Sequence, residues 1–139
     1  MATEVVYSRK IRYSDTDAQA HVFNVNYFVY FDDAITDYMD LAVGSSHKEE
    51  GYDIFLAHAE CDFKSSALLH ETLATRVRVE KIGNTSIVFL LTTTEEASGR
   101  LVVTGKEIYV TVDSATGKPV PVPNTLREAI ARIEGWDNV

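Results

Sequence analysis

The sequence contains a single cysteine, Cys61, and this scarcity excludes an intrachain disulfide. Positive charge is also scarce, because 13 lysines and arginines stand against 21 aspartates and glutamates, for a formal net charge of -8. Nucleic acids and anionic membrane surfaces are bound through clustered basic residues, so we expect neither as a partner. An anionic ligand would depend on a few bases, namely Arg76, Arg78, Lys81, Arg100 and Lys106.

Long apolar runs are missing as well. No stretch approaches the roughly 18 uninterrupted apolar residues of a membrane helix, since aspartates such as Asp32 and Asp37 interrupt the longest one. The first residues lack the basic start and apolar run of a signal peptide. We therefore expect a soluble protein of the cytoplasm, and the 139 residues fit one domain spanning positions 1–139.

Several familiar motifs are absent. The sequence has no glycine-rich phosphate loop, no serine-hydrolase elbow and no Cys-x-x-Cys or helical His-x-x-x-His pair. His58, Glu60 and Asp62 alternate in a strand-like run that sends Cys61 to the opposite face, so they form at most a polar ladder. We expect no metal site and no cofactor.

The pattern of apolar residues predicts the order strand, long helix, four strands, short helix. Residues at helical spacing between Tyr27 and Ala42 predict the long helix, which should end near Gly44. Leu126, Ile130 and Ile133 predict the terminal helix, with Asn124 or Thr125 as its cap. The predicted strands span Val5–Tyr13, Ile54–Lys64, Leu73–Ile82, Ser86–Thr94 and Leu101–Val112.

This order indicates an α+β fold with a largely antiparallel sheet. Phe28 and Val29 widen the apolar stripe of the long helix beyond what a surface helix needs, so we expect the sheet to wrap around it. Five strands alone cannot cover every side of that helix. A second copy should extend the sheet, which predicts a homodimer or a dimer of dimers.

The reactive groups gather between Asp15 and Tyr27, in a turn that leads into the long helix. An aspartate is ionised at neutral pH, so Asp17 can act as a base or a nucleophile, or simply hold a turn together. Asp15 is better suited to satisfying turn amides. Asn24 can cap the helix, and its backbone N–H can bind an oxyanion beside the helix dipole. His21 can orient the turn, hold a substrate oxygen, shuttle protons or pack.

The segment Asp15-Thr16-Asp17-x-x-Ala20-His21-Val22-x-Asn24-x-x-Tyr27 resembles the Asp-x-Asp-x-x-Gly-His-Val-x-Asn-x-x-Tyr signature of acyl-CoA thioesterases related to 4-hydroxybenzoyl-CoA thioesterase. These are hotdog-fold proteins, in which a sheet wraps a long central helix. The resemblance covers roughly residues 5 to 113. It implies hydrolysis of an acyl-CoA to a carboxylic acid and a thiol, with coenzyme A as part of the substrate.

The resemblance also implies roles for individual residues. Asp17 would be the catalytic carboxylate, the Asn24 backbone amide would polarise the carbonyl, and Tyr27 would pack near the pocket. The phosphates of coenzyme A would lie across a dimer interface, near the turn from Gly83 to Ser86. The implied phosphate-binding residues of that turn are Lys81, Asn84 and Ser86.

Two positions depart from the family pattern. Ala20 replaces the usual glycine, which tolerates positive φ where alanine is strained. Phe23 replaces a polar residue with an apolar wall and, together with Phe28, favours a bulky apolar or aromatic acyl tail.

Two other functions remain open. One is a hydratase or dehydratase of the same architecture, in which His21 and Asp17 form an acid and base pair acting on a β-hydroxyacyl thioester. The other is a module that binds acyl thioesters without catalysis. The sequence leaves the acyl group open, and does not distinguish coenzyme A from a carrier protein.

Overall fold

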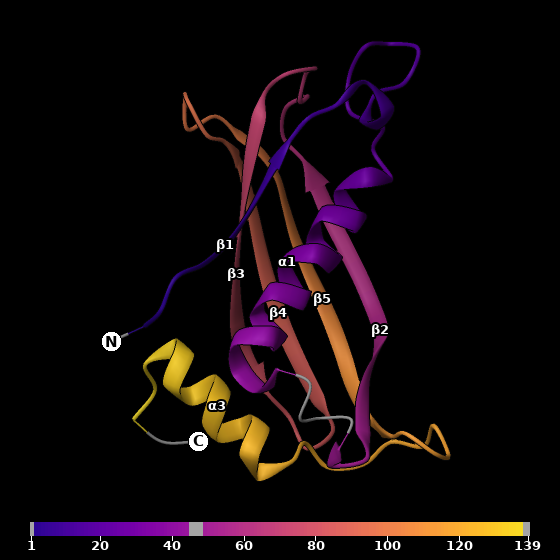
Figure 1. Cartoon of the computed structure of the whole chain (residues 1–139), viewed down its shortest axis with the longest axis vertical. Helices are drawn as coiled ribbons and strands as arrows, with labels where there is room; N and C mark the ends of the chain where they lie inside the picture. Colours follow the sequence, from indigo (N-terminus) through magenta and orange to yellow (C-terminus); the bar gives the residue numbers. More distant parts are fainter. Residues whose placement is uncertain (1, 45–48, 138–139) are drawn as a thin grey trace.

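A long helix, α1 (Asn26–Val43), lies along one face of a five-stranded sheet in this computed structural model, which describes residues 2–44 and 49–137 (Figure 1). Neighbouring strands are all antiparallel, in the order β1-β3-β4-β5-β2. The strands are β1 (Val5–Lys10), β2 (Tyr52–Phe63), β3 (Thr72–Ile82), β4 (Ser86–Glu95) and β5 (Leu101–Asp113). The predicted α+β fold is confirmed.

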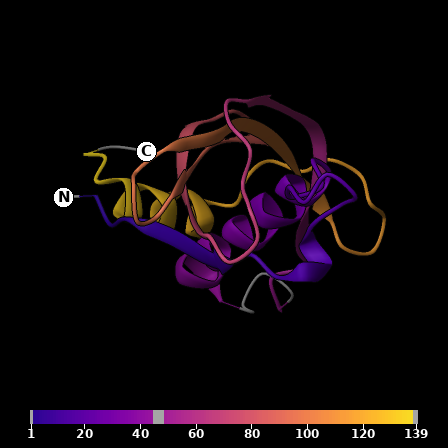
Figure 2. The same ribbon diagram turned by 90° about the horizontal axis from the view of Figure 1, so that it is seen from above.

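The core forms between α1 and the concave face of the sheet, which curves around the helix (Figure 2). The buried residues of α1 recur at intervals of three and four, so one stripe of the helix faces the sheet. Opposite them, alternate strand residues such as Val77, Phe89 and Val103 are fully buried. The buried helix residues are Tyr27, Tyr30, Phe31, Ala34, Ile35, Tyr38 and Met39.

The ends of α1 confirm one prediction and correct another. Gly44 ends the helix with a positive φ of 57°, which favours glycine, and its N–H bonds to the Asp40 carbonyl at 3.0 Å. The helix begins at Asn26, with Val25 at the capping position and no side-chain cap. Asn24 is therefore not the helix cap, because the chain turns into the helix two residues after it.

The first strand is shorter than predicted. The Ile11 N–H bonds to the Glu71 carbonyl, and the chain then forms a 3₁₀ turn, η1 (Tyr13–Asp15). Tyr13 remains 82% exposed and ends the alternation that the sequence shows. β1 therefore stops at Lys10, and the chain is free to fold into the turn that contains Asp17.

The terminal helix α3 (Asn124–Glu134) packs beside the lower part of α1 and β3 (Figure 1). Pro123 takes its capping position without a side-chain bond, and the Thr125 hydroxyl donates to Glu50, so the predicted cap is wrong. The buried Glu134 carboxylate holds the helix in place. It accepts hydrogen bonds from the Tyr38 hydroxyl at 2.6 Å and the Arg78 guanidinium at 2.7 Å.

β2 is an edge strand with unusual exposure of apolar side chains. β5 is its one neighbour within the described chain, and the opposite edge of β2 is unpaired. Phe55, Leu56 and Phe63 are each more than half exposed. No described helix is both long enough and apolar enough to cross a bilayer.

Candidate active site

Asp15 organises the turn between β1 and α1 from its centre. Its carboxylate accepts hydrogen bonds from the Arg9 guanidinium at 2.7 Å and the Arg12 N–H at 2.8 Å. Its carbonyl accepts from the Phe23 N–H and the Asn26 side-chain amide, each at 2.9 Å. Burial acts to raise the pKa of Asp15, but the Arg12 N–H and the Arg9 guanidinium outweigh it and hold that pKa below its usual value. The Asp15 carboxylate therefore has a structural role, which is to hold the turn together.

Asp17 lies on the exposed side of the same turn. Its N–H bonds to the His21 carbonyl at 3.0 Å, and its own carbonyl accepts the Ala20 N–H at 3.0 Å. One carboxylate oxygen accepts the Gln19 N–H at 2.9 Å. The other carboxylate oxygen has no hydrogen-bond partner anywhere in residues 2–44 and 49–137. The turn therefore fixes the aspartate while leaving one oxygen available.

The Ala20 conformation explains the family's preference for glycine at this position. Its φ is 64°, in the left-handed region where the Cβ of an alanine crowds its own backbone. The bonds that Asp17 makes to Ala20 and His21 on either side keep this conformation in place. Ala20 therefore holds a conformation that glycine adopts without strain.

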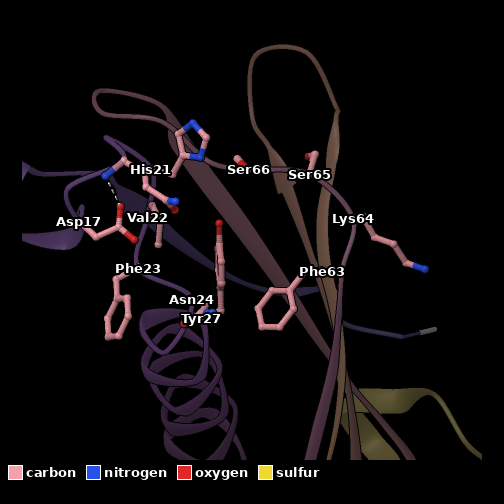
Figure 3. A pocket seen from close by; sticks show the side chains of 11 residues that line it. Asp17, His21, Val22, Phe23, Asn24, Tyr27, Phe63, Lys64, Ser65 and Ser66 are labelled. Carbon is pink, nitrogen blue, oxygen red and sulfur yellow. Dashed lines mark hydrogen bonds between the residues drawn. The ribbon is translucent and has the colours of Figure 1, made fainter.

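A cleft of about 690 Å³ opens beside Asp17 (Figure 3). The turn and the start of α1 form one wall, and the end of β2 with the next three residues forms the other. Asp17, His21, Asn24, Phe23 and Tyr27 all line this cleft, so the structure brings together five of the residues singled out in the sequence. The remaining lining residues are Gln19, Val22, Phe63, Lys64, Ser65 and Ser66.

The Asn24 backbone N–H is free to bind an oxygen atom. None of the described residues accepts a hydrogen bond from it. The nearby N–H groups of Phe23 and Asn26 are, in contrast, bonded to the carbonyls of Asp15 and Phe23. α1 starts two residues later, so this amide lies close to the positive end of the helix dipole. An oxyanion in the cleft would find a donor here.

Tyr27 and Phe63 form the apolar part of the cleft. Tyr27 is 3% exposed, and its ring packs against that of Phe63 at a centroid distance of 5.9 Å. The Tyr27 hydroxyl accepts the Ala67 N–H at 3.3 Å, and burial raises the pKa of this phenol. Tyr27 therefore remains neutral and ties α1 to the segment that follows β2.

Arg100 supports the opposite wall, a role that the sequence did not indicate. Its guanidinium donates to the Ser65 hydroxyl at 3.2 Å and to the Ser66 carbonyl at 3.0 Å. The same group holds the Glu71 carboxylate through two bonds of 2.8 and 3.1 Å. Because Arg100 is 35 residues from Ser65 along the chain, no local spacing could reveal this contact.

The bases considered for phosphate binding are mostly engaged elsewhere. Arg76 pairs with Glu4, Arg78 with Glu134, Arg100 with Glu71, and Lys106 with Glu80. Lys64, which is not among those bases, lines the cleft, and its side chain points away from Asp17 (Figure 3).

The predicted phosphate-binding residues Lys81, Asn84 and Ser86 do not join this cleft within one protomer. The register aligns Phe63 with Val103 and Thr93, and Ser86 lies seven residues away along β4. That separation is about 23 Å at the usual rise of a strand. The turn between β3 and β4 instead holds α3, because the Arg127 guanidinium donates to the Gly83 and Asn84 carbonyls.

Phe28 is also outside the cleft. Its ring meets Phe31 edge-on at 6.0 Å, and it faces a second pocket between α1 and β2. Phe23 and Phe28 were both predicted from the sequence to contact the acyl tail, and the structure places them in two adjoining pockets.

Comparison with known proteins agrees with this architecture. The Bacillus subtilis protein YsmA is 26% identical over 120 residues, which cover 86% of this chain and 80% of YsmA. Slr0204, a 1,4-dihydroxy-2-naphthoyl-CoA thioesterase from Synechocystis, superposes with a TM-score of 0.82 at 17% identity, over 92% of this chain and 96% of Slr0204. SAV2348 from Staphylococcus aureus, solved in complex with CoA, gives a TM-score of 0.87 at 17% identity, over 96% of this chain and 85% of SAV2348. The sequence matches the thioesterase-like superfamily over residues 11–130. The hotdog fold and the family predicted from the sequence are confirmed, and the chain belongs to the thioesterase-like superfamily.

Proposed function

We propose that the protein hydrolyses an acyl-CoA thioester to a carboxylic acid and free thiol. The observation that carries the proposal is one cleft lined by both Asp17 and Asn24. Among the described residues, one Asp17 carboxylate oxygen and the Asn24 backbone N–H have no hydrogen-bond partner. Membership of the thioesterase-like superfamily supports this chemistry. Of the structurally similar proteins, Slr0204 is a CoA thioesterase and SAV2348 was solved in complex with CoA.

The two groups have complementary roles in the reaction. The Asn24 N–H donates a hydrogen bond to the thioester oxygen as negative charge develops on it, and one such donor contributes about 3 kcal/mol to transition-state stabilisation. Asp17 either attacks the carbonyl carbon and expels the thiolate, forming an anhydride that water then opens, or removes a proton from the attacking water. In both routes the thiolate leaves with the electron pair of the broken C–S bond and is protonated by solvent.

The walls of the cleft suit the rest of the substrate. Phe23, Tyr27 and Phe63 offer apolar surface beside the reacting carbon. Among the described residues that line the cleft, Lys64 is the only lysine or arginine, so we assign the coenzyme A phosphates to its side. The sequence-based assignment to Lys81 involves a second protomer and stays a prediction beside this one.

The catalytic assignment is tested with Asp17→Asn, which preserves shape and removes the charge. Thiol release from a panel of short, long, branched and aromatic acyl-CoAs should fall by about 10³-fold or more, since general-base or nucleophilic catalysis is lost. Asp37→Asn is the matched control, because Asp37 is exposed on α1 away from the cleft. Full activity of the Asp17 variant would refute the assignment.

His21 supports a second candidate reaction, because it lines the same cleft as Asp17. An imidazole and a carboxylate so placed can serve as the acid and base of a dehydratase that removes water from a β-hydroxyacyl thioester. Product analysis separates the two reactions. Hydrolysis releases a free thiol, whereas dehydration produces the ultraviolet absorbance of a conjugated double bond with the thioester intact.

We also propose that the protein forms a homodimer through β2. The unpaired edge of this strand and its exposed Phe55, Leu56 and Phe63 are features that soluble proteins normally cover. Antiparallel pairing of two β2 strands would join both sheets into one. Phe55→Glu should shift the mass measured by analytical ultracentrifugation toward the monomer, whereas the exposed Glu96→Gln should leave it unchanged.

A further inference from the structure

The turn that contains Asp17 is bonded to the supporting segment, residues 64–71, which joins β2 to β3. The Val22 N–H donates a hydrogen bond to the Ala67 carbonyl of this segment at 2.9 Å. Within the turn, the His21 carbonyl accepts the Asp17 N–H at 3.0 Å. Because Val22 follows His21 directly, two backbone hydrogen bonds connect Asp17 to Ala67. The position of Asp17 in the cleft therefore depends on the position of the supporting segment.

Arg100, the residue before β5, holds the supporting segment on both sides of Ala67. Its guanidinium donates a hydrogen bond to the Ser66 carbonyl at 3.0 Å. The same guanidinium binds both carboxylate oxygens of Glu71, at 2.8 and 3.1 Å. One of those oxygens accepts the Leu68 N–H at 2.7 Å. The carbonyl that receives the turn thus lies between two points that Arg100 fixes.

The turn and the supporting segment each contain a non-glycine residue with a left-handed backbone. The φ angle is 64° at Ala20 and 75° at His70. Such conformations persist where the surrounding contacts fix them, and they are common at functional sites. The Glu71 N–H bonds to the Leu68 carbonyl at 3.1 Å and closes the turn around His70. By holding the Glu71 carboxylate, Arg100 stabilises a conformation that the supporting segment alone disfavours.

An arginine suits this position because its guanidinium is a planar fork of donors. Four hydrogen bonds from this one group reach Ser65, Ser66 and the two oxygens of Glu71. The hydrogen bond from Arg100 holds the pKa of Glu71 below its usual value, so the pair is ionised at neutral pH. A lysine ammonium is a single point of charge and cannot span these positions. Neither Arg100 nor Glu71 is among the described residues that line the cleft.

The Asn24 side of the cleft is held by different contacts. The Phe23 N–H, next to Asn24, bonds to the Asp15 carbonyl at 2.9 Å, and the Asp15 carboxylate binds Arg9. Arg9 and Arg100 therefore fix two different parts of the site, the carbonyl-binding amide and the carboxylate. Loss of the Arg100 contacts should shift the carboxylate while leaving the amide in place.

We propose that Arg100 is a positioning residue for thioester hydrolysis, which sets the place of the Asp17 carboxylate relative to a carbonyl bound at Asn24. It acts through the backbone bond between Ala67 and Val22, without touching the substrate. The inference rests on the proposed function, because it requires Asp17 to react with the thioester or with water.

The test is Arg100→Lys, which keeps the charge and removes the fork. Amide hydrogen exchange measured by NMR should become about tenfold faster or more at Asp17 and Val22, and should change by less than about twofold at Phe23. The kcat for the best acyl-CoA of the panel should fall by about 10- to 100-fold, since a carboxylate misplaced by about 1 Å loses that factor. The KM should change by less than about threefold, because no group that contacts the substrate is removed. Circular dichroism at the assay temperature checks that both proteins are fully folded.

Controls and outcomes separate this inference from the proposed function. Arg76→Lys, which alters an exposed ion pair with Glu4, should change neither exchange nor kcat. If Arg100→Lys fails to fold, Glu71→Gln should give the same pattern with smaller changes, since it weakens the grip of Arg100. Lower stability with unchanged kcat, or unchanged exchange at the turn, would overturn the inference and leave Arg100 a purely structural residue. No thiol release from the wild-type protein would refute the proposed function, whereas faster exchange in Arg100→Lys would still show that Arg100 holds the turn.

Discussion

Arg9 donates a hydrogen bond of 2.7 Å to the Asp15 carboxylate and joins the last part of β1 to the turn that bears Asp17. The Arg9 guanidinium also lies over the ring of Tyr30, 5.4 Å from its centroid. Asp15 is buried, while Asp17, two residues on, is exposed in the cleft. The first carboxylate thus builds the turn and the second is left for chemistry.

Replacing Asp15 should weaken the fold and the activity together. Asp15→Ala leaves the Arg12 N–H and the Arg9 guanidinium without their acceptor, so the free energy of unfolding should fall by about 1–3 kcal/mol. Urea denaturation at pH 7 measures this loss. Glu96→Gln, on the exposed surface, should change the unfolding free energy by less than about 0.5 kcal/mol.

The pH dependence of the Asp15 contribution has a defined sign. The folded-state pKa of Asp15 is below its unfolded value of 3.8, so the unfolded chain binds the proton more tightly. The contribution is complete above that value and is lost as the pH falls through the lower folded-state pKa. The difference in unfolding free energy between wild type and Asp15→Ala should therefore narrow below pH 4. A difference that stays constant down to pH 2 would contradict this assignment.

Ala20→Gly should stabilise the protein. The φ of 64° is strained by about 1–2 kcal/mol for alanine, whereas glycine loses about 0.5–1 kcal/mol of additional chain entropy on folding. A net gain of roughly 0.5–1 kcal/mol in unfolding free energy follows. Ala18→Gly provides the control, because Ala18 has a negative φ and should gain nothing. Equal effects of the two substitutions would show that the turn is not strained at Ala20.

The sequence predicted the architecture well because its signals are local and periodic. The apolar stripe that begins at Tyr27 and the glycine at position 44 identify the two ends of α1 within one residue. The alternation in the strands likewise locates β3 and β5 within one residue. The sequence-based prediction of strand ends failed where a long-range contact overrides the local strand pattern. At Ile11, just after the end of β1, the backbone N–H bonds to the Glu71 carbonyl.

The site divides in the same way. Asp17, His21 and Asn24 are close in sequence, so one turn necessarily brings them together. The contacts of Arg100 with the wall of the cleft could not be predicted, because they join segments that are far apart in the sequence. The phosphate site near Lys81 came from the family resemblance and stays a prediction, because it lies across a dimer interface, whereas within one protomer the strand register separates that turn from Asp17.

Glu107 should make stability depend on pH in the direction opposite to Asp15. Burial and the nearby charge of Asp32 raise its folded-state pKa to about 7 from the usual 4.5, so the folded protein binds the proton more tightly. Wild-type stability should decline relative to Glu107→Gln as the pH rises from about 5 to 8, by on the order of 1–3 kcal/mol. Denaturation of both proteins across this range measures the effect. For Glu60→Gln, at an exposed position, the free energy of unfolding should change with pH as it does in wild type.

Gly105→Ala tests how closely α1 approaches the sheet. A methyl group at Gly105 would overlap the Phe31 ring, which is fully buried and packed against Phe28. Inserting it into a filled core should lower the free energy of unfolding by about 1–3 kcal/mol. Phe31→Leu removes the ring that the methyl group would meet. The double variant should therefore lose less free energy of unfolding than the sum of the losses in the two single variants. Additive losses would show that α1 can move away from β5 at little cost, and that the wrapped helix is less tightly seated than the Gly105 contact indicates.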